Sequence, residues 1–148
     1  MDKVIEDVVA VQAQAGEASQ RPATEQQLAT ARDELRTRFG ASLPDGYAQF
    51  LGRVNGVDFH GLVLYGAGQS QAAPGAGGFW QGLVEANALW REGPDHDGYL
   101  VLGETDMDLL TVDLDGGRSL LRDKVSGDVN EEFASVRDAI DRLLQARL

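Results

Sequence analysis

Apolar residues recur at helical spacing at the start of the chain. Val4, Ile5, Val8, Val11 and Ala15 fall on one side of a helix, so the pattern predicts an amphipathic N-terminal helix within residues 1–16. The polar stretch GEASQRPA follows as a linker.

A second helix is predicted after this linker, where the sequence TEQQ has the form of a capping box. The Thr24 hydroxyl can accept a hydrogen bond from the backbone N–H of Gln27, and the Gln27 side chain can accept one from the backbone N–H of Thr24. Gly40 is predicted to end this helix. The apolar face comprises Leu28, Ala31, Leu35 and Phe39.

The stretch LPDGYAQFLGRVNG predicts a third helix and the turn that leaves it. Pro44 suits the first helical turn, because its missing N–H has no intrahelical role there. Asn55-Gly56 can adopt the left-handed conformation and is expected to end the helix. The core-facing positions are Leu43, Tyr47, Phe50, Leu51 and Val54.

Strand-like patterns begin after this helix. Residues 59–65 form a nearly continuous apolar run, which predicts one buried strand. Three further strands are predicted at residues 99–102, 109–114 and 119–124. The Asp-Gly pair in DLDGGR indicates a tight hairpin between the last two.

Two more helices are predicted around these strands. Residues 67–78 are rich in Gly, Ala and Gln and offer little to bury, so we expect a flexible loop there and a helix from about Phe79 to about Arg91. Asp128 with Glu131 resembles another capping box and predicts the start of the last helix. Its apolar face comprises Phe133, Val136, Ile140, Leu143 and Leu144.

This order of elements predicts one α+β domain over residues 1–148. Helices come first, strands follow and a helix closes the chain, which favours a mixed or largely antiparallel sheet of about four to six strands over a doubly wound parallel sheet. A length of 148 residues with 43% apolar content is enough for a conventional core.

Charge narrows the choice of partners. The chain has 13 Lys and Arg against 24 Asp and Glu, a net charge of −11, so we expect it to repel nucleic acid and to attract a basic protein. The plain alternative is that acidic residues keep the protein soluble. Cysteine is absent, which excludes disulfides and thiol chemistry. No apolar run approaches the roughly 20 residues of a membrane span and no signal-peptide pattern is present, so we expect a cytoplasmic protein that does not bind membranes.

Few residues suit catalysis. His60 lies in the predicted apolar strand, where an imidazole bonded to the backbone is the simpler interpretation, and His96 lies between Asp95 and Asp97 in a solvated loop. Ser70 in GQSQA comes within one residue of the hydrolase elbow, but a proline and several glycines follow where the elbow needs a helix. We therefore expect no enzyme, and a hydrolase using Ser70 or a His96–Asp pair is the least favoured alternative.

Acidic residues cluster at Glu104, Asp106 and Asp108, without the pattern of a metal site. An apolar run at residues 109–112 occupies positions where a calcium loop needs ligands. The glycine-rich stretches GAGQSQ and GAGG lack the lysine and the helix entry of a phosphate loop. We expect no metal and no cofactor, and these carboxylates remain available to a basic side chain.

The passage from Thr24 to Gly66 resembles the start of the SMI1/KNR4 (SUKH) superfamily. That family shows a capped helix, a spacer, LP-x-x-Y-x-x-F/L-L, and N-G before the first strand. The matching residues are Leu43, Pro44, Tyr47, Phe50, Leu51, Asn55 and Gly56. Later stretches, VEANALWRE, YLVLGETDMDLLTVDLDGG and EEFASVRDAI, are similar to the YrhA-like branch, whereas residues 67–78 match no family motif.

The resemblance implies a small α+β fold and, for bacterial members, an immunity protein. Such a protein binds and neutralises a cognate secreted toxin, for example a polymorphic toxin or a type VI secretion effector. A basic, nuclease-like toxin would suit the charge, and a non-catalytic regulatory or scaffold domain is the alternative. The toxin, its binding face and the oligomeric state are left open. Candidate partner-binding residues are Glu104, Asp106, Asp108, Asp95, Asp97 and Trp90.

Overall fold

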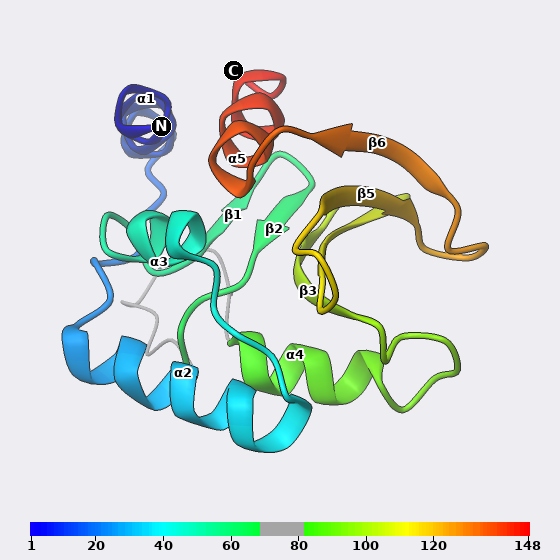
Figure 1. The fold of residues 1–148 in the computed structure, drawn as a ribbon. Helices are drawn as coiled ribbons and strands as arrows, with labels where there is room; N and C mark the ends of the chain where they lie inside the picture. Colours follow the sequence, from blue (N-terminus) through cyan, green and yellow to red (C-terminus); the bar gives the residue numbers. More distant parts are fainter. Residues whose placement is uncertain (69–81) are drawn as a thin grey trace.

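The computed structural model describes residues 1–68 and 82–148, which form an α+β arrangement of helices and one sheet (Figure 1). The helices of this described part are α1 (Asp2–Gln14), α2 (Glu25–Phe39), α3 (Asp45–Leu51), α4 (Leu83–Trp90) and α5 (Val136–Gln145). The strands are β1 (Val57–Phe59), β2 (Leu62–Leu64), β3 (Tyr99–Glu104), β4 (Asp108–Asp113), β5 (Ser119–Asp123) and β6 (Val129–Phe133). The predicted fold class is confirmed.

The sheet is an antiparallel meander in which each strand pairs with the next along the chain, in the order β1-β2-β3-β4-β5-β6. The registers shift at Val101/Gly103 in β3 and at Leu121/Arg122 in β5. Figure 1 shows α2 and α4 on one side of the molecule, with α4 next to β3, whereas α1, α3 and α5 gather on the other side.

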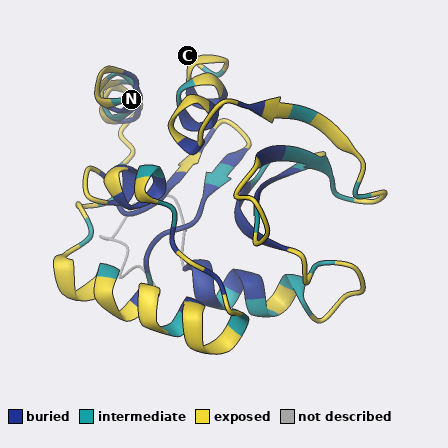
Figure 2. Ribbon diagram, in the orientation of Figure 1, coloured by how far each residue is buried: buried dark blue, intermediate teal, exposed yellow. Residues whose placement is uncertain are grey.

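The core lies between these two groups of helices. Residues 99–103 of β3 are all buried, which explains why that strand reads as a continuous apolar run. Figure 2 shows the contrast between these buried central elements and the exposed outer face of α2. Gly103 allows β2 to approach, because a Cβ there would lie 2.4 Å from the Val63 carbonyl oxygen.

Local signals correctly predicted both ends of the second helix and the buried face of the third. The Thr24 hydroxyl accepts from the Gln27 N–H at 3.1 Å, and the Gln27 side chain accepts from the Thr24 N–H at 2.8 Å, which completes the predicted capping box. Gly40 ends α2 with a φ of 64°. All five predicted core positions from Leu43 to Val54 are buried.

The predicted single strand at residues 59–65 is wrong, because this run reverses direction. β1 and β2 pair through Phe59 and Leu62, and the turn between them holds both His60 and Gly61 at positive φ, 46° and 82°. His60 is therefore exposed on a turn, and its Nδ1 lies 3.1 Å from the Arg147 carbonyl oxygen.

The third helix is shorter than predicted. It ends at Leu51, and Pro44 precedes it as the N-cap instead of lying in the first turn. Asn55 does not end the helix; its Oδ1 accepts the Ala67 N–H at 2.7 Å, and Gly56, at a φ of 97°, leads the chain into β1. Val54 is therefore buried, as the predicted apolar stripe implies, although it lies beyond the end of the helix.

The predicted capping box at Asp128 and Glu131 is also wrong. Residues 129–133 pair with β5 as strand β6, and α5 begins only at Val136. Ser135 is the true N-cap, because its Oγ accepts the Asp138 N–H at 3.1 Å.

The predicted start of the fourth helix, at Phe79, lies outside the described residues. Within the described residues α4 starts at Leu83 and ends at Trp90, one residue before the predicted end. Most of the predicted 67–78 loop lies outside the described residues. Its first residue, Ala67, is buried, with 4% of its surface exposed.

Candidate functional site

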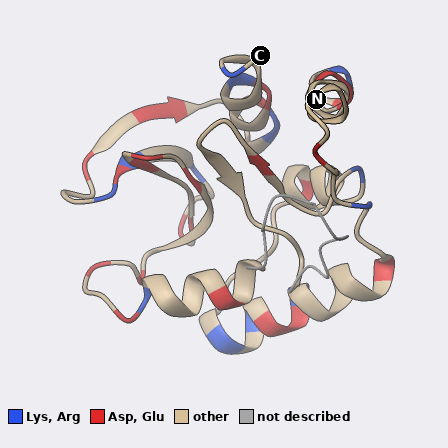
Figure 3. Cartoon of the chain, turned by 180° about the vertical axis from the view of Figure 1, so that it is seen from behind, with Lys and Arg blue, Asp and Glu red and all other residues tan. Residues whose placement is uncertain are grey.

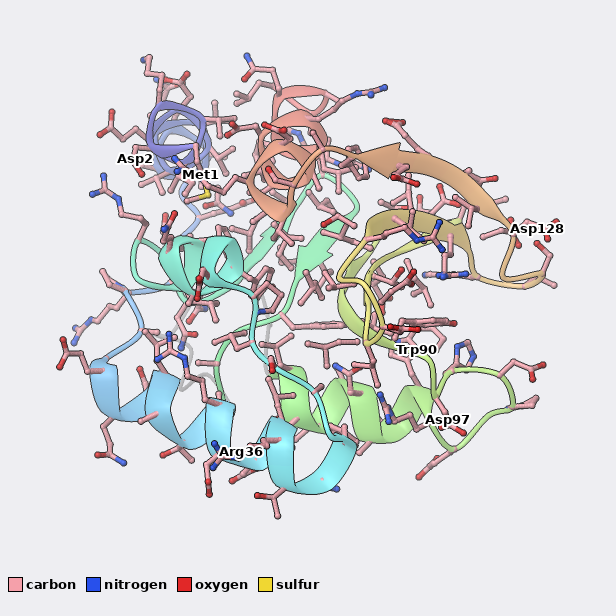
Figure 4. All side chains as sticks on the ribbon, viewed as in Figure 1. Met1, Asp2, Arg36, Trp90, Asp97 and Asp128 are labelled. Atoms are coloured by element: carbon pink, nitrogen blue, oxygen red, sulfur yellow. The ribbon has the colours of Figure 1, made fainter. Side chains whose placement is uncertain are left out.

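The six predicted partner-binding residues fall into two groups, one at the C-terminal end of α4 and one at the end of β3. Trp90 closes α4, and Asp95 and Asp97 lie in the loop that follows it (Figure 4). Glu104 is the last residue of β3, Asp106 lies in the turn, and Asp108 is the first residue of β4.

A buried tyrosine joins the two groups. The Trp90 Nε1–H donates to the Tyr65 hydroxyl at 3.1 Å, and that hydroxyl donates to Glu104 Oε2 at 2.5 Å. Lys124 is the last member of this series of side-chain contacts, with its Nζ 3.4 Å from Glu104 Oε1. Burial raises the pKa of Tyr65 far above its ordinary value, and Glu104 raises it further, so the phenol stays a donor. Trp90 and Glu104 are thus parts of one network.

A second set of polar and aromatic side chains continues from this network. The Arg122 guanidinium lies 4.6 Å from the centre of the Tyr99 ring and bonds Asp113 Oδ1 at 2.9 Å. The His96 Nδ1 lies 2.6 Å from the Tyr99 hydroxyl, and the His96 ring meets the Trp90 ring edge-on at 5.7 Å. These contacts link the loop after α4 to strands β3, β4 and β5.

The strand pattern explains why these side chains meet. Tyr99 lies opposite Asp113 in the β3–β4 pair, and Leu109 lies opposite Arg122 in the β4–β5 pair. Side chains alternate between the faces of a sheet, so Tyr99, Asp113 and Arg122 share one face. Sequence reasoning missed Tyr65, Lys124, Arg122 and Asp113, because no local motif marks them.

The remaining predicted residues are more open. Asp95 and Asp97 are exposed, and Asp95 adopts a positive φ of 68°. Asp106 is exposed at the tip of its turn, whereas Asp108 is half-buried and accepts from Asn130 Nδ2 at 2.7 Å. Figure 3 shows further acidic residues on α2, α4 and β6. These exposed carboxylates therefore give much of the described surface a negative charge.

The described residues were searched for metal-binding and catalytic groupings. Among them, no set of three or more His, Cys, Asp or Glu side chains is placed to hold a metal ion. His60 and His96 lie on separate turns, and Ser70 lies outside the described residues. No helix in the described part of the chain is both long and apolar enough to cross a membrane.

The fold and this site define a small α+β domain with a six-stranded antiparallel meander and a half-buried charged and aromatic network. The chain is similar in structure to a crystal structure of a protein from Pseudomonas syringae pv. tomato, with a TM-score of 0.63 and 20% sequence identity over 98% of this chain and 99% of that one. At this identity the likeness concerns the fold alone. No protein-family model matches the chain, and no curated protein matches it.

Proposed function

We propose that this protein is a cytoplasmic immunity protein of the SMI1/KNR4 (SUKH) type, which binds a cognate secreted toxin and neutralises it by covering its active site. The observation that carries the proposal is the family-like stretch from Leu43 to Gly56. Its residues have structural tasks in this fold, which is consistent with the structural role proposed for the signature.

Tyr47 illustrates these tasks. It is fully buried in α3, and its hydroxyl lies 2.5 Å from the Tyr65 carbonyl oxygen and 2.9 Å from that of Leu102. One hydroxyl thereby ties the helix to the chain after β2 and to β3. Asn55 adds a second tie through the Ala67 N–H. A signature that holds the core leaves the surface free to differ between members, as recognition of different toxins would demand.

Charge supports a basic partner. Asp95, Asp97 and Asp106 are exposed and form no ion pair with any described residue, so their field extends into solvent. Trp90 and Glu104 belong to the internal network and would support the binding face from beneath. Association with a basic toxin would then be fast at low ionic strength and would slow as salt is added.

Co-expression tests this function directly. The product of the adjacent open reading frame is expressed alone and together with this protein, and growth and complex formation are measured. We expect toxicity alone, rescue together, and a complex that co-purifies. Absence of both binding and rescue overturns the proposal, and binding to a non-toxic neighbour favours the regulatory alternative.

A charge variant locates the binding face. Asp95→Asn with Asp97→Asn should slow association severalfold at low salt, and the difference should shrink at high salt. Asp33→Asn with Glu34→Gln on α2 removes the same charge elsewhere and serves as the control. Equal association rates for the two double variants would place the partner away from the loop after α4.

A further inference from the structure

β6 is the accessible edge of the sheet. It pairs on one side with β5, and no backbone hydrogen bond from another described segment reaches residues 129–133. Figure 1 shows β6 as the outermost strand, with α5 near its C-terminal end only. The opposite edge, β1, has three residues, and the Gln12 side chain of α1 reaches its Asp58 carbonyl at 3.3 Å. An unpaired edge is a template for another strand.

The register identifies which backbone groups of β6 point outward. The Asp113 N–H donates to the Arg118 carbonyl at 3.0 Å, and hydrogen-bonded pairs recur every second residue, so Thr111–Leu120 is also such a pair. The backbone groups of Leu120 therefore serve β4. Glu132 lies opposite Leu120 in the β5–β6 pair, so its N–H and C=O point away from β5, to the outer edge.

The charge of β6 selects the kind of strand that it would accept. The stretch DVNEEF, residues 128–133, contains Asp128, Glu131 and Glu132 and no basic residue. Glu131 is ion-paired with Arg142 of α5, and Glu132 lies 3.7 Å from Arg118, whereas Asp128 is exposed and forms no ion pair with a described residue. In an antiparallel pair of two β6 strands, acidic side chains would face each other, which is destabilising. A strand with lysine or arginine would instead place opposite charges across the new pair.

A hollow of about 560 Å³ continues from the end of this edge. It lies between the start of α3, the β4–β5 turn, the end of β6 and the start of α5, and its lining includes Gly117, Arg118, Glu132, Phe133 and Arg137. A chain that pairs with Glu132 would have space there for a side chain as it leaves the strand.

We propose that an extended basic segment of the toxin adds to β6 as a further strand of the sheet, with main-chain hydrogen bonds to Glu132 at its centre. This inference rests on the proposed immunity function and specifies how that function is performed. Main-chain pairing supplies affinity and depends little on sequence, whereas the exposed carboxylates of Asp128 and Glu132 favour a basic segment.

A matched pair of substitutions at one position tests the proposal. Glu132→Pro removes the outward N–H, and proline is tolerated at an edge position whose N–H faces solvent. Glu132→Ala keeps the N–H and removes the same carboxylate, including its 3.7 Å contact with Arg118. The probe is the inactivated toxin domain from the adjacent open reading frame. We expect the proline variant to bind at least about tenfold more weakly than the alanine variant.

Amide hydrogen exchange on the unmodified chain gives a readout that does not depend on how the proline variant folds. The Glu132 amide should exchange at least about tenfold more slowly in the complex, since a new strand would hold its proton. A complex that leaves this amide unprotected and binds both variants equally overturns the inference alone. If the unmodified chain forms no complex at all, the immunity function fails with it. A dimer of this chain that Glu132→Pro dissociates would assign the edge to a second copy and overturn the toxin assignment.

Discussion

The side chain of Asn87 makes the hydrogen bonds to the Val101 backbone that a neighbouring strand would otherwise make. It is fully buried in α4, and its amide Nδ2 donates to the Val101 carbonyl at 2.8 Å while its Oδ1 accepts the Val101 N–H at 2.8 Å. β2 pairs with β3 only at Gly103 and Glu104, so it does not reach Val101. The side-chain amide therefore provides the donor and acceptor that a neighbouring strand would provide.

Replacing this amide should be among the most damaging single changes in the chain. Asn87→Ala leaves the N–H and the C=O of Val101 buried without these partners, and each such group costs about 1–3 kcal/mol. The expected loss is therefore about 2–6 kcal/mol, a large share of the 5–15 kcal/mol typical of a domain. Asn130→Ala is the control, since Asn130 is exposed and its single bond to Asp108 should contribute no more than about 1 kcal/mol.

The substitution Asn87→Asp should make the free energy of unfolding depend on pH. An ionised carboxylate at this position would turn one oxygen toward the carbonyl oxygens of Leu83 and Val101, which now accept from Nδ2 at 2.8 Å each. Burial and these oxygens would raise the pKa of the introduced carboxyl above its unfolded value of about 3.9. The folded state then holds a proton that the unfolded state releases. Stability is retained below about pH 4 and falls by about 1.4 kcal/mol per pH unit up to the folded pKa.

Urea unfolding from pH 4 to pH 8, followed by tryptophan fluorescence and circular dichroism, measures both effects. The aspartate variant should lose stability relative to the unmodified chain as the pH rises, whereas the alanine variant should show a constant deficit. A flat profile for Asn87→Asp, or an Asn87→Ala loss no greater than that of Asn130→Ala, would refute the strand-replacement reasoning.

Three further results are expected. Thr24→Ala should cost about 1 kcal/mol in urea unfolding by removing the capping box, whereas Thr30→Ala, at an exposed position inside α2, should cost nothing measurable. Gly103→Ala should cost more than about 2 kcal/mol, because the new Cβ would meet the Val63 carbonyl oxygen at 2.4 Å, and Gly98→Ala, with open space, should be neutral. Burial raises the pKa of all three tyrosines, so phenolate absorbance should appear only above pH 10, and stability should fall as the pH rises through that range; normal titration near pH 10 would contradict this.

Elements defined by contacts within a few residues were predictable from the sequence. The capping box at Thr24 and the stop at Gly40 act within a single turn, and the stripe from Leu43 to Val54 depends only on helical periodicity. The reversal at His60 was not predictable in this way. The apolar residues of the two strands are separated in the sequence only by His60 and Gly61. The turn depends on the positive φ of both residues, which helix and strand periodicity does not mark, and Gly61 was its one local signal.

β6 was missed because its identity depends on a distant partner. Val129 to Glu132 are mostly exposed, so they carry neither the apolar run of a buried strand nor a clear alternation. Pairing with β5 makes them a strand, and the true helix signal, Ser135 followed by Asp138, lies just beyond. Trp90 and Glu104 were candidate residues, but the network that joins them was missed for a similar reason: Trp90 and Tyr65 are 25 residues apart, and Glu104 and Lys124 are 20 apart.

Paired and unpaired carboxylates would contribute to the proposed recognition in different ways. Glu104 is paired with Lys124 and Asp113 with Arg122, so covering these partly buried groups would leave no charge without a partner. They can fix the shape of a binding face but add little long-range attraction. The exposed aspartates of the loop after α4 contribute mainly to the rate of association. Solvent weakens each of their individual contacts, but their summed field attracts a basic partner over a longer range. Strong binding would therefore require a further source of affinity, and the main-chain pairing proposed at β6 would supply one that neither group of charges provides.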